Sequence, residues 1–231
     1  MAGSEVFEVL VLTAVPAEAA AVLSGFDVGE TVELGPYRGT AVKTGAGRVA
    51  VLAGGVGPAR AAACAGTALA LSRPALLVVA GVAGGFAGRA AVGDAVLADA
   101  IVHADLGAGS PGGFLPISEL GFGADRALPE PALVALAAAR TGAGVGPVLT
   151  VSTVTGTDAG AAELAGRYDP VAEAMEGAGG WAAAEAYGVP ILELRAVSNP
   201  VGRRDRSTWD LPAALATLTR AVADLFQEPL P

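Results

Sequence analysis

The sequence predicts an α/β protein built on a single-domain, mostly parallel, twisted sheet that is flanked by helices on both faces. Two observations support this. Short apolar runs rich in β-branched residues recur along the chain, and most of them end in a glycine-rich turn followed by an alanine-rich, helix-forming segment. Repetition of strand, turn and helix is typical of parallel sheets covered by helices. No linker or internal repeat is evident, so we expect one domain over residues 1–231.

The chain begins with a predicted strand, helix and hairpin. Residues 9–13 are a short β-branched run, typical of a buried strand. Pro16 then indicates a helix start, because proline fits the first helical turn, and we expect a helix at 17–23. Two further strand-like runs at 31–34 and 37–43 flank a Gly-Pro pair and predict a hairpin.

The next third of the chain predicts the centre of the sheet. A strand at 49–52 leads through a glycine-rich turn into an alanine-rich helix at 59–71. The run at 75–80 is strongly apolar and ends in a second glycine-rich turn, and a further strand follows at 94–99. Ligands of such folds bind beyond the carboxyl ends of the strands, so these turns are candidate binding loops.

A long connection separates the two halves of the chain. Residues 103–127 are rich in glycine and proline, and a compact domain rarely carries so long a loop unless it has a function. Beyond it, apolar runs alternate with helix-forming segments. We expect helices at 131–140, 177–187 and 211–226 and strands at 148–154, 172–175 and 190–197.

Charge and composition exclude several classes of function. The net charge of −9 has the wrong sign for a nucleic-acid binder or for a protein that binds an anionic membrane surface. We find no stretch of about 18–20 apolar residues that would span a membrane, and Glu5 and Glu8 lie where a signal peptide carries positive charge. We therefore expect a soluble, cytoplasmic protein. Cys64 is the only cysteine and is expected to be a small buried core residue.

Sequence motifs for common cofactors are absent. The first strand is not followed by Gly-x-Gly, so the dinucleotide-binding fingerprint is missing, and no Walker pattern occurs. His103 is the only histidine, so a histidine-based metal site would depend on it alone. We expect neither a cofactor nor a metal.

Two acids and one amide lie where a ligand would bind. Glu18 follows the first strand, and Glu176 stands among small residues at a strand-to-helix junction. Either carboxylate can simply stabilise a helix start, so each becomes a catalytic candidate only with the other as partner. Asn199 either caps a turn before Pro200 or presents a donor and an acceptor to the edge of a heterocycle.

Five segments in order resemble the purine nucleoside phosphorylase and nucleosidase superfamily, with the spacing of its methylthioadenosine/S-adenosylhomocysteine nucleosidases. Each motif is weak alone, but together they span nearly the whole chain. They are Thr-Ala-Val-Pro-Ala-Glu at 13–18, Gly-Val-Gly-Pro-Ala-Arg-Ala-Ala at 55–62, Gly-Val-Ala-Gly-Gly-Phe at 81–86 with Gly-Asp at 93–94, Ala-Met-Glu-Gly-Ala at 174–178, and Arg-Ala-Val-Ser-Asn-Pro at 195–200.

The resemblance implies a nucleoside phosphorylase-like fold and a role for each candidate. Glu18 would activate water below the sugar, and Glu176 would hold the ribose hydroxyls with Met175 beside the sugar. Cleavage passes through an oxocarbenium-like state, as in glycoside hydrolysis. The other substrate contacts that the resemblance implies are Ala83, Gly84 and Gly85 along the ribose and Thr155 and Thr157 at the base.

Residues 105–116, 119–123 and 198–207 are most similar to the branch of this superfamily that acts on futalosine. That branch releases hypoxanthine and leaves dehypoxanthine futalosine, a step of menaquinone biosynthesis. Asn199 replaces the aspartate of the adenine-specific nucleosidases, and an amide suits a 6-oxopurine. Asn199 does not account for the proton that the leaving base takes up at its N7 atom, so Asp205 and water are the candidate sources of that proton.

The substrate's carboxyphenyl group requires its own contacts. The 103–127 loop, with Phe114 and Phe122, is a candidate lid or dimer arm that would contact the ring. One of the arginines Arg203, Arg204 and Arg206 is a candidate for binding the carboxylate. The arginine run is equally well explained as a solvated surface cluster. The resemblance also implies a homodimer or a larger homo-oligomer.

Three rival functions remain. A phosphorylase would need cations around phosphate, for which Arg48, Arg60 and Arg89 are available. An adenine-type nucleosidase is disfavoured by Asn199. A nucleoside-binding protein without turnover is disfavoured by the presence of both acids.

Overall fold

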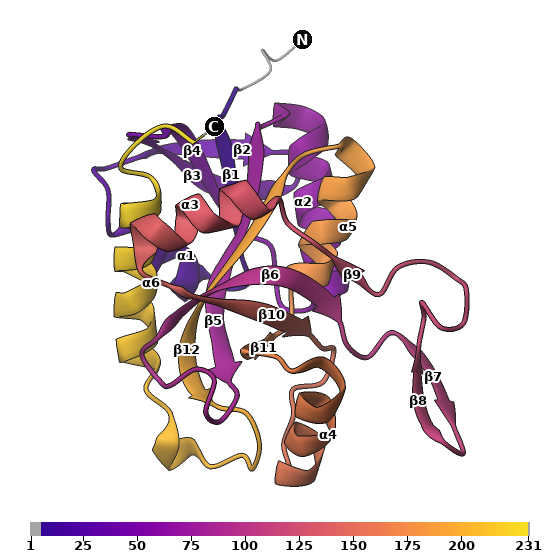
Figure 1. The fold of residues 1–231 in the computed structure, drawn as a ribbon. Helices are drawn as coiled ribbons and strands as arrows, with labels where there is room; N and C mark the ends of the chain where they lie inside the picture. Colours follow the sequence, from indigo (N-terminus) through magenta and orange to yellow (C-terminus); the bar gives the residue numbers. More distant parts are fainter. Residues whose placement is uncertain (1–5, 231) are drawn as a thin grey trace.

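The computed structural model describes residues 6–230, which form a large mixed sheet with helices on both faces (Figure 1). The strands are β1 Val9–Thr13, β2 Glu30–Leu34, β3 Tyr37–Thr44, β4 Gly47–Ala53, β5 Leu76–Gly85, β6 Ala95–His103, β7 Gly107–Ser110, β8 Gly113–Pro116, β9 Arg126–Ala127, β10 Gly144–Thr150, β11 Ala172–Ala174 and β12 Ile191–Pro200. The α-helices are α1 Pro16–Leu23, α2 Pro58–Ser72, α3 Pro131–Thr141, α4 Asp158–Tyr168, α5 Gly177–Tyr187 and α6 Leu211–Leu225, and a 3₁₀ turn, η1, spans Arg206–Thr208.

The order of strands in the sheet is β11-β10-β6-β12-β5-β1-β4-β3-β2. Strands β4, β1, β5 and β12 run parallel through its centre. Because β11 also pairs with β5, the strands β5, β12, β6, β10 and β11 close into a ring. The predicted sheet with flanking helices is confirmed, but it is more mixed than expected. The β2–β3–β4 edge is antiparallel, and so are the pairs β12–β6 and β11–β5 that help to close the ring.

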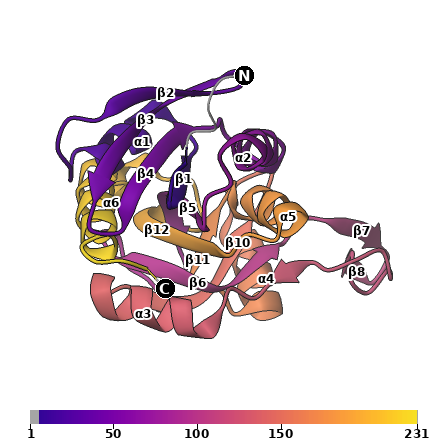
Figure 2. The ribbon, with the colours of Figure 1, turned by 90° about the horizontal axis from the view of Figure 1, so that it is seen from above.

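The two largest apolar clusters lie on the two faces of the sheet, and Figure 2 shows the helices that cover each face. Helices α2 and α5 cover one face, where alanines let them pack closely on the sheet. Helices α1, α3 and α6 cover the other, and α6 buries the apolar stripe that its sequence predicts, including Ala214, Leu218 and Val222. The two layers fix the carboxyl ends of β1, β5 and β11 between them, and this is the edge where the candidate residues converge.

The structure differs from the sequence prediction in several places. Strand β5 continues to Gly85, so residues 81–85 belong to the strand and do not form the expected turn, and β6 continues to His103 rather than ending at residue 99. Within the 103–127 connection, β7 and β8 form a hairpin that projects from the body of the protein, and β9 pairs with β6 (Figure 1). Helix α4 was not predicted, because it contains two glycines and its apolar stripe, Ala161, Leu164 and Tyr168, is only partly buried against a smaller cluster of core residues. Strand β10 covers Gly144–Thr150 rather than 148–154, because a bulge at Gly146/Pro147 accommodates a proline within the ladder.

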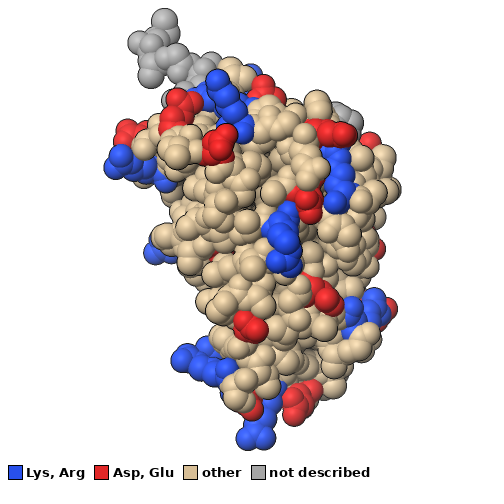
Figure 3. All heavy atoms as spheres, turned by 90° about the vertical axis from the view of Figure 1, so that its left-hand side faces the viewer, with Lys and Arg blue, Asp and Glu red and all other residues tan. Residues whose placement is uncertain are grey.

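Charged side chains of both signs are interspersed over the face seen in Figure 3, without a large patch of one sign. A phosphate backbone is bound by clustered cations, so this face lacks the pattern of a nucleic-acid site. None of the helices formed by residues 6–230 combines the length and the apolar character that crossing a bilayer requires.

Cys64 is expected to be inert in the folded protein. Its side chain is fully buried in α2 against the sheet, and burial raises the pKa of its thiol to about 12. Because only the thiolate reacts, we expect the native protein to show no measurable reaction with a thiol-exchange reagent at pH 8. After denaturation, Cys64 should react and release one equivalent of the reagent's leaving group per chain. Rapid labelling of the native protein would contradict this burial.

Candidate active site

A cleft opens at the carboxyl ends of β1, β5 and β11, beside the last residues of β12. Its volume is about 340 Å³, which suits a small organic ligand. Ligands of open α/β sheets bind at this edge, so the cleft lies where the fold predicts a site. The predicted site residues that line it are Glu18, Ala83, Gly84, Met175, Glu176 and Asn199.

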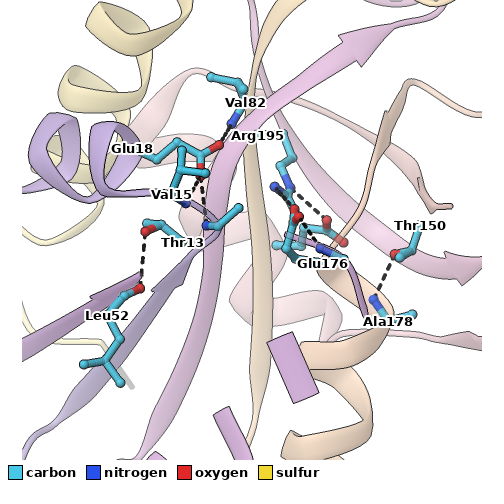
Figure 4. Close-up of polar contacts among 12 residues, drawn as sticks. Thr13, Val15, Glu18, Leu52, Val82, Thr150, Glu176, Ala178 and Arg195 are labelled. Atoms are coloured by element: carbon cyan, nitrogen blue, oxygen red, sulfur yellow. Dashed lines mark hydrogen bonds and ion pairs between the residues drawn. The ribbon is translucent and has the colours of Figure 1, made fainter. Parts of the chain in front are cut away.

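Glu18 is the third residue of α1, and its carboxylate folds back over the start of that helix. Oε2 accepts hydrogen bonds from the backbone N–H groups of Ala14 (2.8 Å) and Val15 (3.1 Å). Oε1 accepts one from Val82 in β5 (2.9 Å), so the carboxylate links β1 to β5 (Figure 4). The result is a carboxylate held in one orientation at the wall of the cleft.

Glu176 stands between β11 and α5, where it occupies the N-cap position of the helix. Its Oε1 accepts a hydrogen bond from the N–H of Gly57 at the start of α2, at 3.1 Å. Its Oε2 accepts one from Nη1 of Arg195, also at 3.1 Å. Thr150 fixes the turn from the other side, since its hydroxyl oxygen accepts from the N–H of Ala178 at 2.8 Å. Glu176 is only 4% exposed, so its contacts to a ligand would be largely free of solvent.

The sequence analysis missed a buried arginine that brings the two acids together. Arg195 of β12 is 1% exposed, and its Nε donates to Oε1 of the buried Glu193 at 2.9 Å. A Cβ on Gly81 would lie 2.6 Å from Oε1 of Glu18 and 2.9 Å from Nη1 of Arg195, so both groups border one small space. Figure 4 shows Glu18 on one side of that space and Arg195 with Glu176 on the other.

Burial and neighbouring charge act in opposite directions on the Arg195 guanidinium. Burial alone lowers its pKa, but the carboxylates of Glu193, Glu176 and Glu18 outweigh burial and raise it. Burial raises the pKa of Glu193, and the charge of Arg195 acts against that rise. One nitrogen of Arg195 and one oxygen of Glu193 have no hydrogen-bond partner among the described residues. Arg195 therefore stays charged and keeps a positive charge against Glu176.

The residue after Glu176 has to be small. A Cβ on Gly177 would lie 2.2 Å from Oε2 of Glu193, which no side chain could accommodate without displacing the carboxylate. The sequence offered a signal for this cluster that we did not use. Glu193 and Arg195 are two residues apart in an otherwise apolar strand, so their side chains share a face and indicate a buried ion pair.

Asn199 lies near the end of β12, with both ends of its amide in local hydrogen bonds. Its Oδ1 accepts from the hydroxyl of Ser198 at 2.8 Å, and its Nδ2 donates to the carbonyl of Pro200 at 3.0 Å. The carbonyl of Ala83 is a second acceptor for the same Ser198 hydroxyl at 3.2 Å, so the single proton of the hydroxyl is shared between the two acceptors. These contacts fix the amide at the wall of the cleft, with a donor and an acceptor that a ligand can share.

The sequence analysis also missed Glu173 in β11, which lines the cleft together with an adjoining hollow. Its carboxylate accepts hydrogen bonds from the Thr155 N–H at 2.8 Å and from the Thr155 hydroxyl. Burial raises the pKa of this carboxyl, and the bonds from Thr155 act in the opposite direction. The predicted residue Thr155 thus borders the adjoining hollow, where it contacts Glu173 directly.

Four predicted contacts lie away from the cleft. Gly85 is buried within β5, and Thr157 caps α4 by accepting from the N–H of Gly160 at 3.1 Å. Phe114 lies on the projecting hairpin, and the exposed Arg203 donates its backbone N–H to Asp158 at 2.9 Å. Arg204, rather than Arg203, lines the adjoining hollow, with its guanidinium over the ring of Trp209, 5.0 Å from the ring centroid.

The fold and this cleft define a class of protein. The family model described as the phosphorylase superfamily matches residues 8–228, and the chain belongs to that superfamily. Two relatives narrow the class. A futalosine hydrolase of Streptomyces coelicolor is 57% identical over 181 residues, which cover 76% of this chain and 77% of that protein. A futalosine hydrolase of Acidothermus cellulolyticus is 47% identical over 223 residues, which cover 94% of this chain and 89% of that protein. The chain therefore belongs to the futalosine hydrolase family.

A solved structure shows the same fold. The futalosine hydrolase of Helicobacter pylori strain 26695 matches with a TM-score of 0.82, over 94% of this chain and 96% of that chain. Its sequence identity is 19%, so this likeness concerns the fold alone.

Proposed function

We propose that this chain is a nucleosidase that hydrolyses the N-glycosidic bond of futalosine, releasing hypoxanthine and leaving dehypoxanthine futalosine. The observation that carries the proposal is a single cleft lined by two buried carboxylates, Glu18 and Glu176, together with the neutral amide of Asn199. Membership of the futalosine hydrolase family supports the choice of substrate.

Glu176 acts on the sugar in this mechanism. As the bond between C1′ and the purine nitrogen breaks, its electron pair moves to the base and positive charge develops on the ribose ring. The Glu176 carboxylate accepts hydrogen bonds from the ribose hydroxyls, and these tighten as the charge develops. Arg195 and the Gly57 N–H hold the carboxylate in place, so it need not reorganise during the reaction.

Glu18 acts on the water. Its carboxylate accepts a proton from a water molecule while the water oxygen forms the new bond to C1′. Three backbone N–H groups fix the carboxylate and leave its remaining lone pairs for the cleft. General-base help of this kind contributes on the order of 10²–10⁴ in rate. Proton and oxygen both come from water, so no other reactant is needed.

The base leaves with a proton at N7. Asp205 was one candidate donor, but it is exposed and lies outside the residues that line the cleft and the adjoining hollow. Hydrogen bonds from the side chain and backbone of Ser207 lower the pKa of Asp205, which disfavours it as an acid. We therefore assign the N7 proton to water that reaches the base through the adjoining hollow. The proton that Glu18 has taken up passes to solvent and neutralises the hydroxide left by that water, so Glu18 is regenerated as a carboxylate.

Asn199→Asp is expected to lower hypoxanthine release from futalosine on the order of 10²-fold, because a carboxylate would face the O6 carbonyl where an amide now donates. The rate of hypoxanthine release by the variant measures this. Activity toward the 6-amino counterpart of futalosine serves as the control and should fall less or rise. A variant that still prefers the 6-oxopurine substrate would show that selectivity lies elsewhere.

The carboxyphenyl end of the substrate needs an apolar wall and a cation. Trp209, Leu211 and Leu215 line the cleft, and Arg204 lines the adjoining hollow. Phe122 belongs to the projecting segment and is 79% exposed, which leaves apolar surface in solvent, whereas Phe114 is half-buried with the Arg167 guanidinium over its ring. We propose that this segment packs against a second copy of the chain, giving a homodimer or a larger homo-oligomer.

We also propose that the reaction takes place in the cytoplasm, within menaquinone biosynthesis.

A phosphorylase is disfavoured by the charge of the cleft. Its lining residues, all in the described part of the chain, include the acids Glu18, Glu173 and Glu176 and no lysine or arginine. Three carboxylates repel phosphate. Two of the arginines that a phosphorylase could have recruited are paired elsewhere, Arg48 with Glu30 and Arg89 with Asp169, and Arg60 is not among the residues that line the cleft.

The proposal is tested by supplying futalosine, inosine and methylthioadenosine to the pure protein in phosphate-free buffer and identifying the released base. We expect hypoxanthine from futalosine at a kcat/KM far above that for the other two. Adenine released from methylthioadenosine with similar efficiency would favour the adenine-type nucleosidase, and no release from any of the three would favour a binding protein.

A further inference from the structure

Glu173 is a buried acid in the cleft that the mechanism above does not use. It is 5% exposed and lines both the cleft and the adjoining hollow. Its two oxygens each accept one hydrogen bond from Thr155, which fixes the plane of the carboxylate and leaves further lone pairs. A buried carboxylate is costly unless it is paired, so its position in a ligand cleft requires an explanation.

The register of the sheet places Glu173 and Asn199 on opposite sides of one glycine. Gly84 of β5 pairs with Glu173 in β11 and with Asn199 in β12. Glu173, directly opposite Gly84 in β11, points to the same face as Gly84. The β5–β12 ladder is irregular between Val197 and Asn199, but the Asn199 amide lies on the side to which a Cβ on Gly84 would point. Strands lie about 4.8 Å apart, so the backbones of Glu173 and Asn199 are separated by roughly 10 Å. That spacing accommodates a flat heterocycle whose edge contacts both side chains.

Gly84 forms the floor between the two polar groups. A Cβ at this position would lie 2.8 Å from Cγ2 of Val201 and 3.2 Å from Nδ2 of Asn199, so any larger residue would crowd the amide. Only glycine fits beneath these side chains, because Val201 and Asn199 already occupy the space that a Cβ would take. The same two residues and Gly84 line both the cleft and the hollow, which indicates that the space is continuous.

A 6-oxopurine presents the pattern that these groups complement. Its N1–H is a donor, its O6 is an acceptor, and N7–H is a donor once the base has taken up a proton. A 6-aminopurine instead presents a lone pair at N1, which a carboxylate repels. An amide can serve O6 and N7 together, but it leaves N1–H without an acceptor.

We propose that Glu173 is a second specificity-determining residue, whose carboxylate accepts the N1–H of the 6-oxopurine while Asn199 binds O6 and N7. This inference rests on the proposed function, because it takes a 6-oxopurine as the leaving base. Thr155 is then a positioning residue that acts on the base through Glu173. The preference for a 6-oxopurine over a 6-aminopurine then depends on Glu173 of β11 and Asn199 of β12 together, and Asn199 alone does not determine it.

The first test changes the ligand and leaves the protein unaltered. We would measure by calorimetry the affinity of the wild type for hypoxanthine and for 1-methylhypoxanthine, which lacks N1–H. A hydrogen bond to a charged acceptor predicts a loss on the order of 10–100-fold for the methylated base. In Glu173→Ala the same methyl group should cost less than about 3-fold, because the acceptor is gone and space has opened. An equal penalty in both proteins would overturn the inference.

The second test is the ratio of kcat/KM for futalosine to that for its 6-amino counterpart. Glu173→Gln should lower this ratio on the order of 10–100-fold, since the amide can donate to an unprotonated N1. Glu185→Gln, an identical change at an exposed position of α5, should leave it unchanged. A role confined to folding would lower the melting temperature and both activities in proportion, which would refute the assignment.

The two proposals fail in different ways. If the wild type releases no hypoxanthine from futalosine and binds no hypoxanthine, the proposed function is wrong. If the wild type does both, but Glu173→Gln keeps the wild-type ratio, only the role of Glu173 is wrong.

Discussion

Glu176→Gln is expected to lower kcat for futalosine on the order of 10³-fold or more while the protein stays folded. The substitution keeps the shape of the side chain and one acceptor oxygen, which can still accept from the N–H of Gly57. It removes the negative charge that stabilises the developing charge on the ribose ring, and it leaves Arg195 with one fewer anionic partner. The loss should therefore appear mainly in kcat.

The measurement is the steady-state rate of hypoxanthine release, with circular dichroism and thermal unfolding as checks on the fold. Glu185→Gln is the matched control, because it removes the same charge from an exposed position of α5. We expect the control to match the wild type. Near-normal turnover in Glu176→Gln would remove this residue from the mechanism.

Glu18→Ala is expected to lower kcat by about 10²–10⁴-fold, because the water loses its general base. The backbone N–H groups of Ala14, Val15 and Val82 also lose their acceptor, so we expect the free energy of unfolding to fall by about 1–3 kcal/mol. A drop in stability alone would thus not identify a catalytic role.

Chemical rescue separates the two effects. The truncation opens space for a small carboxylate next to the same three N–H groups. Added formate should therefore restore part of the activity of Glu18→Ala, and it should leave the wild type and Glu176→Gln unaffected. Absence of rescue in a folded variant, together with residual activity close to that of the wild type, would show that Glu18 serves only the packing of α1 against β5.

Much of the fold could be predicted from local patterns. The β-branched run of β1, the Gly-Pro turn between β2 and β3 and the amphipathic α6 each carry their own signal and lie where predicted. Helix α4 was missed because its apolar repeat, Ala161, Leu164 and Tyr168, is short, only partly buried and interrupted by two glycines. The ring closed by β11 and β5 is also invisible in sequence, since it depends on a pairing between residues about ninety positions apart.

The candidate site was predicted in part. Glu18 and Glu176 are far apart in the chain, and nothing local shows that their carboxylates meet; the family resemblance supplied that expectation. Arg195 and Glu193 were taken as strand residues, although two opposite charges alternating in an apolar strand indicate a buried pair. Phe114 and Arg203 were assigned to the substrate by sequence position, but their placement depends on how a projecting hairpin and an exposed loop pack.

The central claim is that Glu18 directs water, and no other nucleophile, at the sugar carbon of a nucleoside held by Glu176. It is tested most directly by identifying the sugar product by mass spectrometry after the wild type has consumed futalosine in buffer with excess phosphate. The account predicts dehypoxanthine futalosine with a free hydroxyl at C1′ and a rate independent of phosphate. A sugar 1-phosphate, formed at a rate that rises with phosphate, would contradict it.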